Sequence, residues 1–340
     1  MKTQVCIIGG GPSGLLLSQL LHLKGIATVL LERHSREYVL ARIRAGVLEH
    51  GFAALMREAQ CGQRMDREGE IHDGFLISNH GQLQRVDLHK YSGGSSVVVY
   101  GQTELTRDLY EARDRMQGAV IHNAEDVLPH DLTSPNPYVT YRAGDDIVRI
   151  DCDYVIGADG FHGVSRKSIP KDVLKEYEKV YPFGWLGVLS RTKPVSPELI
   201  YARHERGFAL CSMRSQVLSR YYIQVPLSDT VEDWSDDKFW EELKRRLPAD
   251  VAERMLCGQA MMAAADTAMV LALINQFGEF RPCTTVQMNT SFLKPLSGQA
   301  ALVQARVVRA GKSLAFGEID IRGASDGKSA CRATTTYALL

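Results

Sequence analysis

The feature that most constrains the fold is a glycine cluster between two short apolar segments near the start of the chain. Residues 3–8 form an apolar run of strand length, and four of the next six residues are glycines. A helical pattern over 15–24 ends at Gly25, the usual residue after a helix C-terminus. A second apolar run, 27–31, leads directly into Glu32. This order of strand, G-x-G-x-x-G turn, helix, strand and acid predicts a βαβ unit that binds a dinucleotide.

Each glycine of the G-x-G-x-x-G turn has an expected task. Gly9 makes the tight turn, Gly11 lets a pyrophosphate approach the backbone, and Gly14 lets the helix pack on the strand. The N-terminus of the helix would stabilise the phosphate charge, and Glu32 would hold a ribose hydroxyl. The alternative is a glycine-rich loop without a ligand. The acid that stands 18 residues after Gly14 favours the dinucleotide.

The composition excludes several classes of protein. The 340 residues include 40 basic and 40 acidic side chains, so the chain lacks the basic excess of a general nucleic-acid binder. The seven cysteines form no C-x-x-C pair, which argues against a disulfide framework or a zinc site and predicts a cytoplasmic protein without a metal. No apolar run reaches the ~18 residues of a membrane span. The N-terminus enters a strand at once, so a signal peptide is not expected.

The middle of the chain changes from mixed to antiparallel patterning. We expect helices over 39–60 and 103–116 and a hairpin through 144–146. An apolar strand over 152–156 leads to Asp159-Gly160, with Arg166 shortly after. Four strands separated by short turns then predict an antiparallel sheet, set apart from the parallel nucleotide half, over 183–189, 199–203, 208–213 and 220–225.

Two of these strands place polar side chains on common faces. Ser212 and Arg214 are two residues apart and share a face, as do Arg220 and Tyr222 on the next strand. A forked arginine donor with hydroxyl groups beside it suits a planar carboxylate. A solvated sheet face explains the same spacing equally well, so both interpretations stay open at this point.

The last third of the chain has a different pattern. A helix capped by Ser235 ends at Pro248, and a short helix is expected to about residue 256. An apolar helix over 260–276 follows and ends at Gly278. Four long alternating strands then predict a meander with hairpin turns at 311–312 and 326–327, over 284–293, 301–310, 313–321 and 329–338. One helix followed by such a meander is an α+β unit.

Residues 1–256 resemble the para-hydroxybenzoate hydroxylase family of FAD-dependent aromatic monooxygenases. The stretches that carry this resemblance are 7–14, 42–49, 100–104, 159–163, 181–187 and 219–222. The resemblance implies an α/β Rossmann-like FAD-binding domain with an antiparallel substrate sheet. It also implies the cofactors FAD and NADPH, dioxygen as co-substrate and a small aromatic acid as substrate.

The resemblance also implies site residues. The cofactor-binding positions are Gly9, Gly11, Ser13, Gly14, Glu32, Arg42, Arg44, Gln102, Asp159, His162 and Arg166. The substrate-binding positions are Tyr201, Ser212, Arg214 and Tyr222, of which the last three would hold the carboxylate. Tyr201 would meet the phenol oxygen, because a hydrogen bond there favours the electron-rich phenolate. His72 matches the proton-relay position of the family, so Tyr201 and His72 are the expected catalytic residues of this part.

The chain also departs from the family's pattern. Gly163 stands where the D-G-x-x-S-x-x-R motif commonly has serine. The family's second Gly-Asp motif, which contacts the ribityl chain of FAD, has no match. Gly144-Asp145 lies in the expected hairpin and cannot serve. We therefore expect weak binding of FAD.

Residues 258–340 resemble part of the hotdog-fold acyl-CoA thioesterases of the phenylacetate-pathway type, on the stretches 264–269 and 285–295. In that family a carboxylate eight residues after the first glycine of H-G-G acts as base or nucleophile. Gly258 and Asp266 have this spacing, although Cys257 and Gln259 replace the other two residues. The resemblance implies Asp266 as a further catalytic residue and acyl-CoA as a partner, in a homo-oligomer.

The sequence thus predicts three parts: an FAD-binding domain over 1–180, a substrate-binding sheet and helix over 181–256, and a hotdog-like segment over 258–340. The leading hypothesis is FAD- and NADPH-dependent hydroxylation of 4-hydroxybenzoate to 3,4-dihydroxybenzoate. One alternative is an acyl-CoA thioesterase module carried on an inactive flavoprotein remnant. The other is a folded chimera without activity.

Overall fold

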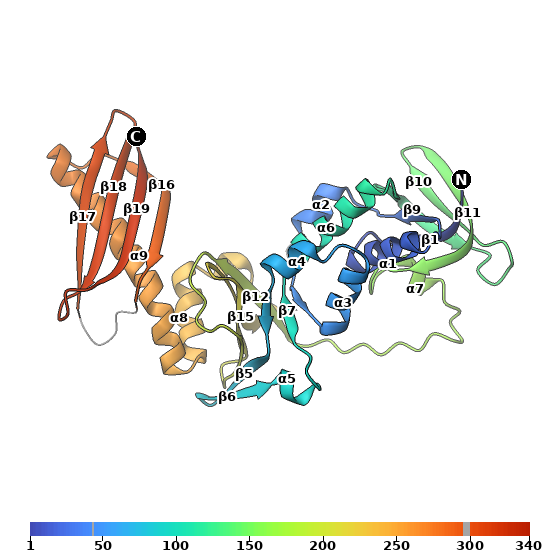
Figure 1. Cartoon of the computed structure of the whole chain (residues 1–340), viewed down its shortest axis with the longest axis horizontal. Helices are drawn as coiled ribbons and strands as arrows, with labels where there is room; N and C mark the ends of the chain where they lie inside the picture. The colour runs from blue at the N-terminus through green and yellow to red at the C-terminus, as the bar shows by residue number, and fades with distance from the viewer. Residues whose placement is uncertain (43, 295–299) are drawn as a thin grey trace. The chain divides into compact units, whose positions relative to one another are not determined.

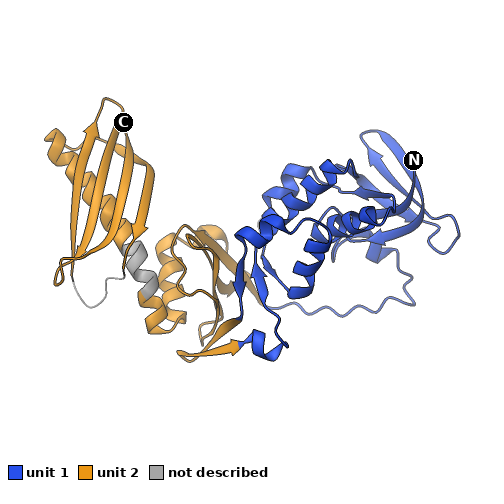
Figure 2. Ribbon diagram, viewed as in Figure 1, with its two compact units in different colours: residues 1–73, 87–181 blue, residues 74–86, 182–340 orange. Residues whose placement is uncertain are grey.

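The computed structural model describes residues 1–42, 44–294 and 300–340, with the backbone alone over 254–260. The chain forms two compact units (Figure 2). The first unit comprises residues 1–73 and 87–181, and the second unit comprises 74–86 and 182–340. The glycine-rich turn therefore belongs to the first unit. The candidate carboxylate clamp, formed by Ser212, Arg214 and Tyr222, belongs to the second.

A six-stranded mixed sheet forms the centre of the first unit (Figure 1), in the order β8-β2-β1-β11-β10-β9. β1 (Lys2–Ile8) runs parallel to both β2 (Thr28–Leu31) and β11 (Asp146–Gly157). The other strands are β8 (Ala119–Ile121), β9 (Glu125–His130) and β10 (Tyr138–Ala143). The predicted hairpin is confirmed, since β10 and β11 are antiparallel and Gly144 between them has a φ of +64°.

The side chains of β1 alternate between two apolar clusters. Val5 and Ile7 pack in a cluster with residues of α1 (Pro12–Leu23) and α6 (Gln102–Arg115). Cys6 and Ile8 belong to a second cluster, which includes side chains of β10 and β11. This strand is buried on both faces, and for this reason its sequence is a continuous apolar run rather than an alternating one.

The single helix predicted over 39–60 is wrong. The structure has α2 (Arg36–Ala41), β3 (Val47–Leu48) and α3 (His50–Glu58) in its place. Arg42 leaves the helical region with a ψ of 103°, and β3 pairs with β7 (Val97–Val99), 50 residues further along the chain. Local periodicity contains no signal for such a distant pairing. The remaining elements of the first unit are α4 (Gln63–Glu68), β4 (Glu70–His72), α5 (Leu88–Tyr91) and α7 (Val164–Lys167).

In the second unit the four predicted antiparallel strands are part of a six-stranded mixed sheet, in the order β12-β15-β14-β13-β5-β6. Its strands are β12 (Phe183–Ser190), β13 (Leu199–Arg203), β14 (Ala209–Ser215), β15 (Leu218–Pro226), β5 (Gly74–Asn79) and β6 (Gln82–Asp87). β5 comes from far earlier in the chain and runs parallel to β13. The short 3-10 turn η1 (Val231–Asp233) and then α8 (Asp236–Arg246) follow the sheet, and Ser235 caps α8 as predicted. Phe239 and Leu243 of α8 pack on one face of the sheet, which leaves the opposite face for the polar candidates.

The C-terminal part of the second unit is the predicted helix and meander. An antiparallel sheet in the order β16-β19-β18-β17 follows α9 (Ala249–Phe277). Its strands are β16 (Cys283–Phe292), β17 (Ala301–Ala310), β18 (Leu314–Gly323) and β19 (Ser329–Leu339). Met261, Ala265 and Met269 of α9 share an apolar cluster with Ile319 and Tyr337 of the sheet.

The prediction of two separate helices after Pro248 is wrong. One helix of 29 residues, α9, runs from Ala249 to Phe277. Pro248 precedes the helix and Gly258 lies within it, where a glycine costs only about 0.5–1 kcal/mol relative to alanine. Gly278 ends the helix with a φ of +75°, as predicted. Among the helices that the structure describes, none is long and apolar enough to cross a membrane.

Gly14→Ala should destabilise the first unit. A Cβ on Gly14 would lie 2.0 Å from the carbonyl oxygen of Gly9, whereas a Cβ on Gly11 would meet nothing within 4 Å. We expect Gly14→Ala to lower the free energy of unfolding by about 1–3 kcal/mol, and Gly11→Ala to leave it nearly unchanged. Hydrogen exchange of the β1 amides, measured against urea, reports on this unit alone. Equal protection in the two variants would contradict the close approach of Gly14 to Gly9.

Candidate functional site

The glycine-rich turn joins β1 to α1 and is shaped by three close backbone approaches. Gly9 has a φ of +115°, and a Cβ there would lie 2.4 Å from the carbonyl oxygen of Ala158. A Cβ on Gly10 would lie 2.7 Å from Cβ of Glu32. Gly14 meets the Gly9 oxygen, as described above. Gly11 alone faces open space, which is the place where a ligand could approach the backbone.

The carboxylate of Glu32 is held at the end of β2 by two backbone groups. Gly10 N–H donates to its Oε2 at 2.8 Å, and His34 N–H donates to its Oε1 at 2.9 Å. The hydroxyl of Tyr110 donates to the carbonyl oxygen of Gly10 at 3.2 Å. Burial raises the pKa of Tyr110, and the negative charge of Glu32 raises it further. Tyr110 therefore stays protonated and remains a donor to the turn.

A cavity of about 500 Å³ opens beside this turn. Its walls come from the ends of β1 and β2, from the segment 124–127 and from the segment 159–164. The lining residues are Ile8, Gly9, Leu31, Glu32, Arg33, His34, Ala124, Glu125, Asp126, Val127, Arg142, Asp159, His162, Gly163 and Val164. The structure thus brings four predicted cofactor residues together around one cavity, namely Gly9, Glu32, Asp159 and His162.

The Asp159 carboxylate shows why the motif has glycine at 163. A Cβ on Gly163 would lie 2.1 Å from Cγ of Asp159, so a side chain there would displace the Asp159 carboxylate from this position. Ser165, two positions later, donates to Asp159 Oδ2 from its backbone N–H at 3.0 Å and from its hydroxyl at 3.1 Å. Sequence reasoning missed Ser165. Its signal was a serine displaced by two positions from the place where the family pattern has one.

The other predicted cofactor residues lie elsewhere in the first unit. Ser13 is exposed in the first turn of α1, and Gln102 is the first residue of α6. Arg42 donates to the Tyr38 hydroxyl at 3.1 Å, and Arg44 is exposed. Arg166 pairs with Glu176 at 2.8 Å and lies 4.2 Å from the ring centre of Phe161. Both Arg166 and His162 line a further cavity of about 540 Å³.

The substrate candidates of the second unit lie in register across its antiparallel sheet. Tyr201 on β13 is opposite Leu210 on β14, which in turn is opposite Tyr222 on β15. In the next row of the same face, Ser212 is opposite Arg220. Gly187 on β12 is opposite Tyr222, and a Cβ there would lie 2.6 Å from the Tyr222 ring. The missing side chain at 187 therefore makes room for this ring.

Two arginines give this face a positive charge. Burial lowers the pKa of Arg214, and the charge of Arg220 lowers it further. The Arg220 guanidinium lies 4.6 Å from the ring centre of Tyr222, and its Nη1 is buried without a hydrogen-bond partner among the described residues. Two neighbouring half-buried cations and an unsatisfied donor are the surroundings that an anion would stabilise.

The two candidates for proton transfer belong to different units. His72 ends β4 in the first unit and is only 2 % exposed. Tyr201 belongs to the second unit and contacts Phe75 edge to face, with 5.4 Å between the ring centres.

Asp266 lies on α9 and is half-buried rather than fully buried. Its Oδ1 accepts hydrogen bonds from the hydroxyl of Thr285 on β16, at 2.8 Å, and from the hydroxyl of Tyr337 on β19. Burial raises the pKa of Tyr337, and its hydrogen bond to Asp266 raises it further. Gly258, the other residue of the predicted spacing, lies in the part of α9 of which only the backbone is described.

Comparison with known proteins identifies the family. The model of the FAD binding domain family matches residues 2–269. The chain belongs to this family. A second model, that of the thioesterase superfamily, matches residues 257–330, so the predicted hotdog-type segment is confirmed as well.

Two curated relatives carry monooxygenase names. The chain is 51% identical over 261 residues to p-hydroxybenzoate hydroxylase of Acinetobacter baylyi. This match covers 77% of this chain and 64% of the relative. It is 30% identical over 185 residues to 6-methylpretetramide 4-monooxygenase of Streptomyces rimosus. This match covers 52% of this chain and 43% of the relative. The chain thus spans less than two thirds of the length of either relative.

Solved structures confirm the fold of the FAD binding domain family. A probable FAD-dependent monooxygenase from Pseudomonas aeruginosa superposes with a TM-score of 0.63 at 18% identity, covering 76% of this chain and 71% of that one. The p-nitrophenol 4-monooxygenase of Pseudomonas putida superposes with a TM-score of 0.62 at 16% identity. The superposition covers 73% of this chain and 64% of that one. At such identities the likeness concerns the fold alone.

Asp266→Ala should destabilise the C-terminal segment. The substitution removes the carboxylate that accepts from Thr285 and Tyr337 and leaves Tyr337 only the backbone oxygen of Asp266, at 3.2 Å. Loss of hydrogen bonds to a charged acceptor costs about 1.5–3 kcal/mol. Thr267→Ala, at an exposed position next to it, is the matched control and should change the free energy of unfolding by less than about 0.5 kcal/mol. Hydrogen exchange of β19 against urea measures both. Equal effects would show that Asp266 does not tie the helix to the sheet.

Proposed function

We propose that this chain binds FAD and hydroxylates 4-hydroxybenzoate to 3,4-dihydroxybenzoate. In the balanced reaction, 4-hydroxybenzoate, dioxygen, NADPH and a proton give 3,4-dihydroxybenzoate, water and NADP⁺. The observation that carries the proposal is the face of the second unit's sheet where Tyr201, Ser212, Arg214 and Tyr222 lie together with Arg220. The 51% identity to p-hydroxybenzoate hydroxylase supports the same substrate.

The carboxylate of the substrate would bind at the arginine end of this face. Arg214 offers forked donors that match both carboxylate oxygens, and Ser212 and Tyr222 add hydroxyl donors. Burial and Arg220 make the charge on Arg214 costly when nothing neutralises it. A carboxylate removes this cost, so the clamp favours a ring acid over a neutral phenol.

The phenol oxygen of the substrate would lie at the Tyr201 end. Tyr201 and Tyr222 are separated by one strand, so the same face can hold both ends of a single ring. A hydrogen bond at Tyr201 Oη would favour loss of the phenol proton, and the phenolate is the more electron-rich ring. We assign His72 to the relay that carries this proton away. Its burial in the first unit supports a role inside the protein rather than that of a surface histidine.

The residues of the first unit fit the adenosine and pyrophosphate half of FAD. Gly11 leaves room for close approach at the start of α1, and Glu32 presents a fixed carboxylate beside a cavity of about 500 Å³. Gly9, Ser13, Gly14, Arg42, Arg44, Gln102 and Asp159 complete the proposed cofactor set. When bound, FAD together with NADPH and dioxygen supplies the oxygen atom that enters the ring.

We assign NADPH to the neighbourhood of His162 and Arg166. Both residues line the cavity of about 540 Å³, which also carries Lys167 and Lys171. Four basic side chains at one cavity suit a ligand that carries phosphates. Arg166 shares its charge with Glu176, so part of this site is already neutralised.

Arg214→Lys provides the decisive test. Lysine keeps the charge but loses the forked geometry, and a charge-assisted hydrogen bond is worth about 1.5–3 kcal/mol, so affinity for 4-hydroxybenzoate should fall about ten- to a hundredfold. Arg203→Lys is the control, because Arg203 is an exposed arginine on β13 of the same sheet. Affinity is measured by calorimetry, and 3,4-dihydroxybenzoate is measured by chromatography with FAD and NADPH supplied. No product from the unaltered chain, or equal affinity in the two variants, would overturn the proposal.

Thioester hydrolysis by the C-terminal segment is the second candidate function. It is favoured by Asp266, a carboxylate that faces the sheet with one oxygen fixed by Thr285 and Tyr337. An acyl-CoA would be the substrate, with Asp266 as base or nucleophile. β16 and β17 are the edge strands of this sheet, and unpaired edges favour pairing with a second copy of the chain.

Asp266→Asn separates catalysis from structure in this second candidate. Asparagine keeps an oxygen acceptor for Tyr337, so the fold should persist, while the loss of the carboxylate should abolish any release of CoA thiol from an aryl-CoA. Thiol release is followed with a chromogenic disulfide, and the fold is checked by hydrogen exchange of β19. Undiminished release in this variant would remove Asp266 from the catalytic residues. No release from the unaltered chain would leave the segment as structure alone.

A further inference from the structure

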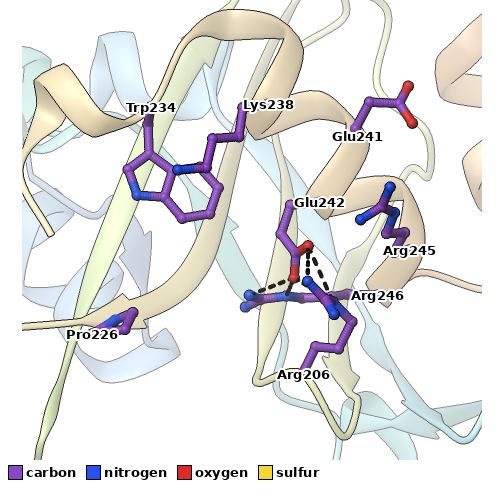
Figure 3. A pocket seen from close by; sticks show the side chains of 8 residues that line it. All are labelled: Arg206, Pro226, Trp234, Lys238, Glu241, Glu242, Arg245 and Arg246. Atoms are coloured by element: carbon purple, nitrogen blue, oxygen red, sulfur yellow. Dashed lines mark hydrogen bonds and ion pairs between the residues drawn. The ribbon is translucent and has the colours of Figure 1, made fainter.

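A cavity of about 610 Å³ lies beside α8 in the second unit (Figure 3). It is distinct from the carboxylate clamp, since it contains none of the residues assigned there. Its lining combines charged side chains of α8 with residues from the sheet and from the segment before the helix. The lining residues are Arg206, Pro226, Trp234, Lys238, Glu241, Glu242, Arg245 and Arg246.

Glu242 forms a fixed, closed ion-pair network on one side of this cavity. It is 6 % exposed and accepts hydrogen bonds from Arg206 at 2.7 and 2.9 Å and from Arg246 at 2.8 Å. Burial opposes its ionisation, but the hydrogen bonds from the two arginines outweigh this and lower the pKa of Glu242. Arg246 also donates to the backbone oxygens of Phe208 and Gln224, at 3.2 and 2.7 Å. Two arginines share one carboxylate, so this wall keeps a positive charge.

Further cations border the same space. Arg245 is exposed on α8, and within the part of the chain that the structure describes it has no hydrogen bond or ion pair. Lys238 donates to the backbone oxygen of Asp233 at 2.7 Å, which leaves other ammonium protons available. Glu241, the second carboxylate of the lining, is held by Lys244 at 2.9 Å. The lining therefore offers unsatisfied donors and more positive than negative charge.

The opposite wall of the cavity carries the two apolar rings of the lining, those of Trp234 and Pro226. Figure 3 shows Trp234 and Pro226 on one side, and Arg206, Arg245 and Arg246 on the other. The indole N–H of Trp234 donates to Asp229 at 3.0 Å, which fixes the orientation of the ring. The Lys238 ammonium lies 4.4 Å from the ring centre. The indole of Trp234 thus lies across the cavity from the guanidinium groups, with the Lys238 ammonium over its ring.

We propose that this cavity binds a small aromatic carboxylate at a site separate from the clamp on the sheet. The ring of the ligand packs on Trp234 and Pro226, and its carboxylate meets Arg245 and the remaining donors of Arg206. Each wall selects one half of the ligand. A bare anion lacks the ring contact, and a neutral aromatic amide lacks the charge.

The indole signals of the chain provide a direct test. The chain has three tryptophans, so Trp234→Phe assigns the indole N–H signal of Trp234 in a nitrogen-15 correlation spectrum. The titration uses the full chain with Arg214→Gln, which disables the clamp, and benzoate as the probe. We expect a saturable shift of the Trp234 signal with benzoate, and shifts at least threefold smaller with equal concentrations of inorganic phosphate or benzamide.

Two substitutions then test the cationic wall. Arg245→Gln should weaken benzoate binding by about threefold or more, in line with the range for exposed charge pairs. Arg203→Gln removes an exposed positive charge on β13 of the same unit that does not line the cavity, and it should leave the affinity unchanged. The proposal is overturned by the absence of a saturable Trp234 shift, by phosphate or benzamide acting as strongly as benzoate, or by equal effects of the two substitutions.

Discussion

The arrangement of the glycine-rich turn in the first unit depends on hydrogen bonds from two backbone N–H groups to the carboxylate of Glu32. One of these donors belongs to the turn after β1, and the other belongs to the segment after β2. The carboxylate therefore fixes the distance between the glycine-rich turn and the end of the neighbouring strand. The acid assigned to the ribose is already oriented without a ligand, so little conformational entropy remains to be lost at this position on binding. Tyr110 reinforces the arrangement from α6 through the oxygen of Gly10.

Local sequence signals predicted the parts of the fold that are built from neighbouring residues. The turn at 9–14, the hairpin at Gly144 and the helix end at Gly278 each rest on a backbone conformation that glycine adopts at low cost. The failures have a different origin. The segment 39–60 contains β3, which exists only because β7 pairs with it. The continuous α9 likewise reflects tertiary packing, because its apolar side chains contact the C-terminal sheet beyond the point where propensity predicted a break.

The candidate site shows the same division between local and distant causes. Spacing alone placed Ser212 with Arg214 on a face of one strand, and Arg220 with Tyr222 on a face of the next, because strand periodicity is a local property. It gave no sign that Arg220 stands opposite Ser212, or that Gly187 makes room for the Tyr222 ring, because both depend on strand register. Ser165 was missed for a related reason. The hydrogen bonds that join it to Asp159 are set by a turn, and the motif describes that turn only in part.

The pairing of β1 with β11 has a consequence for the order in which the protein forms. The glycine-rich motif occupies the first 14 residues, yet Gly9 lies against Ala158 and β1 pairs with residues 151–157. Parallel pairing across so long a stretch must await synthesis of β11, whereas the hairpin of β10 and β11 can close as soon as it emerges. During translation the glycine-rich turn is therefore one of the last features of the first unit to be completed, although its sequence is among the first to leave the ribosome.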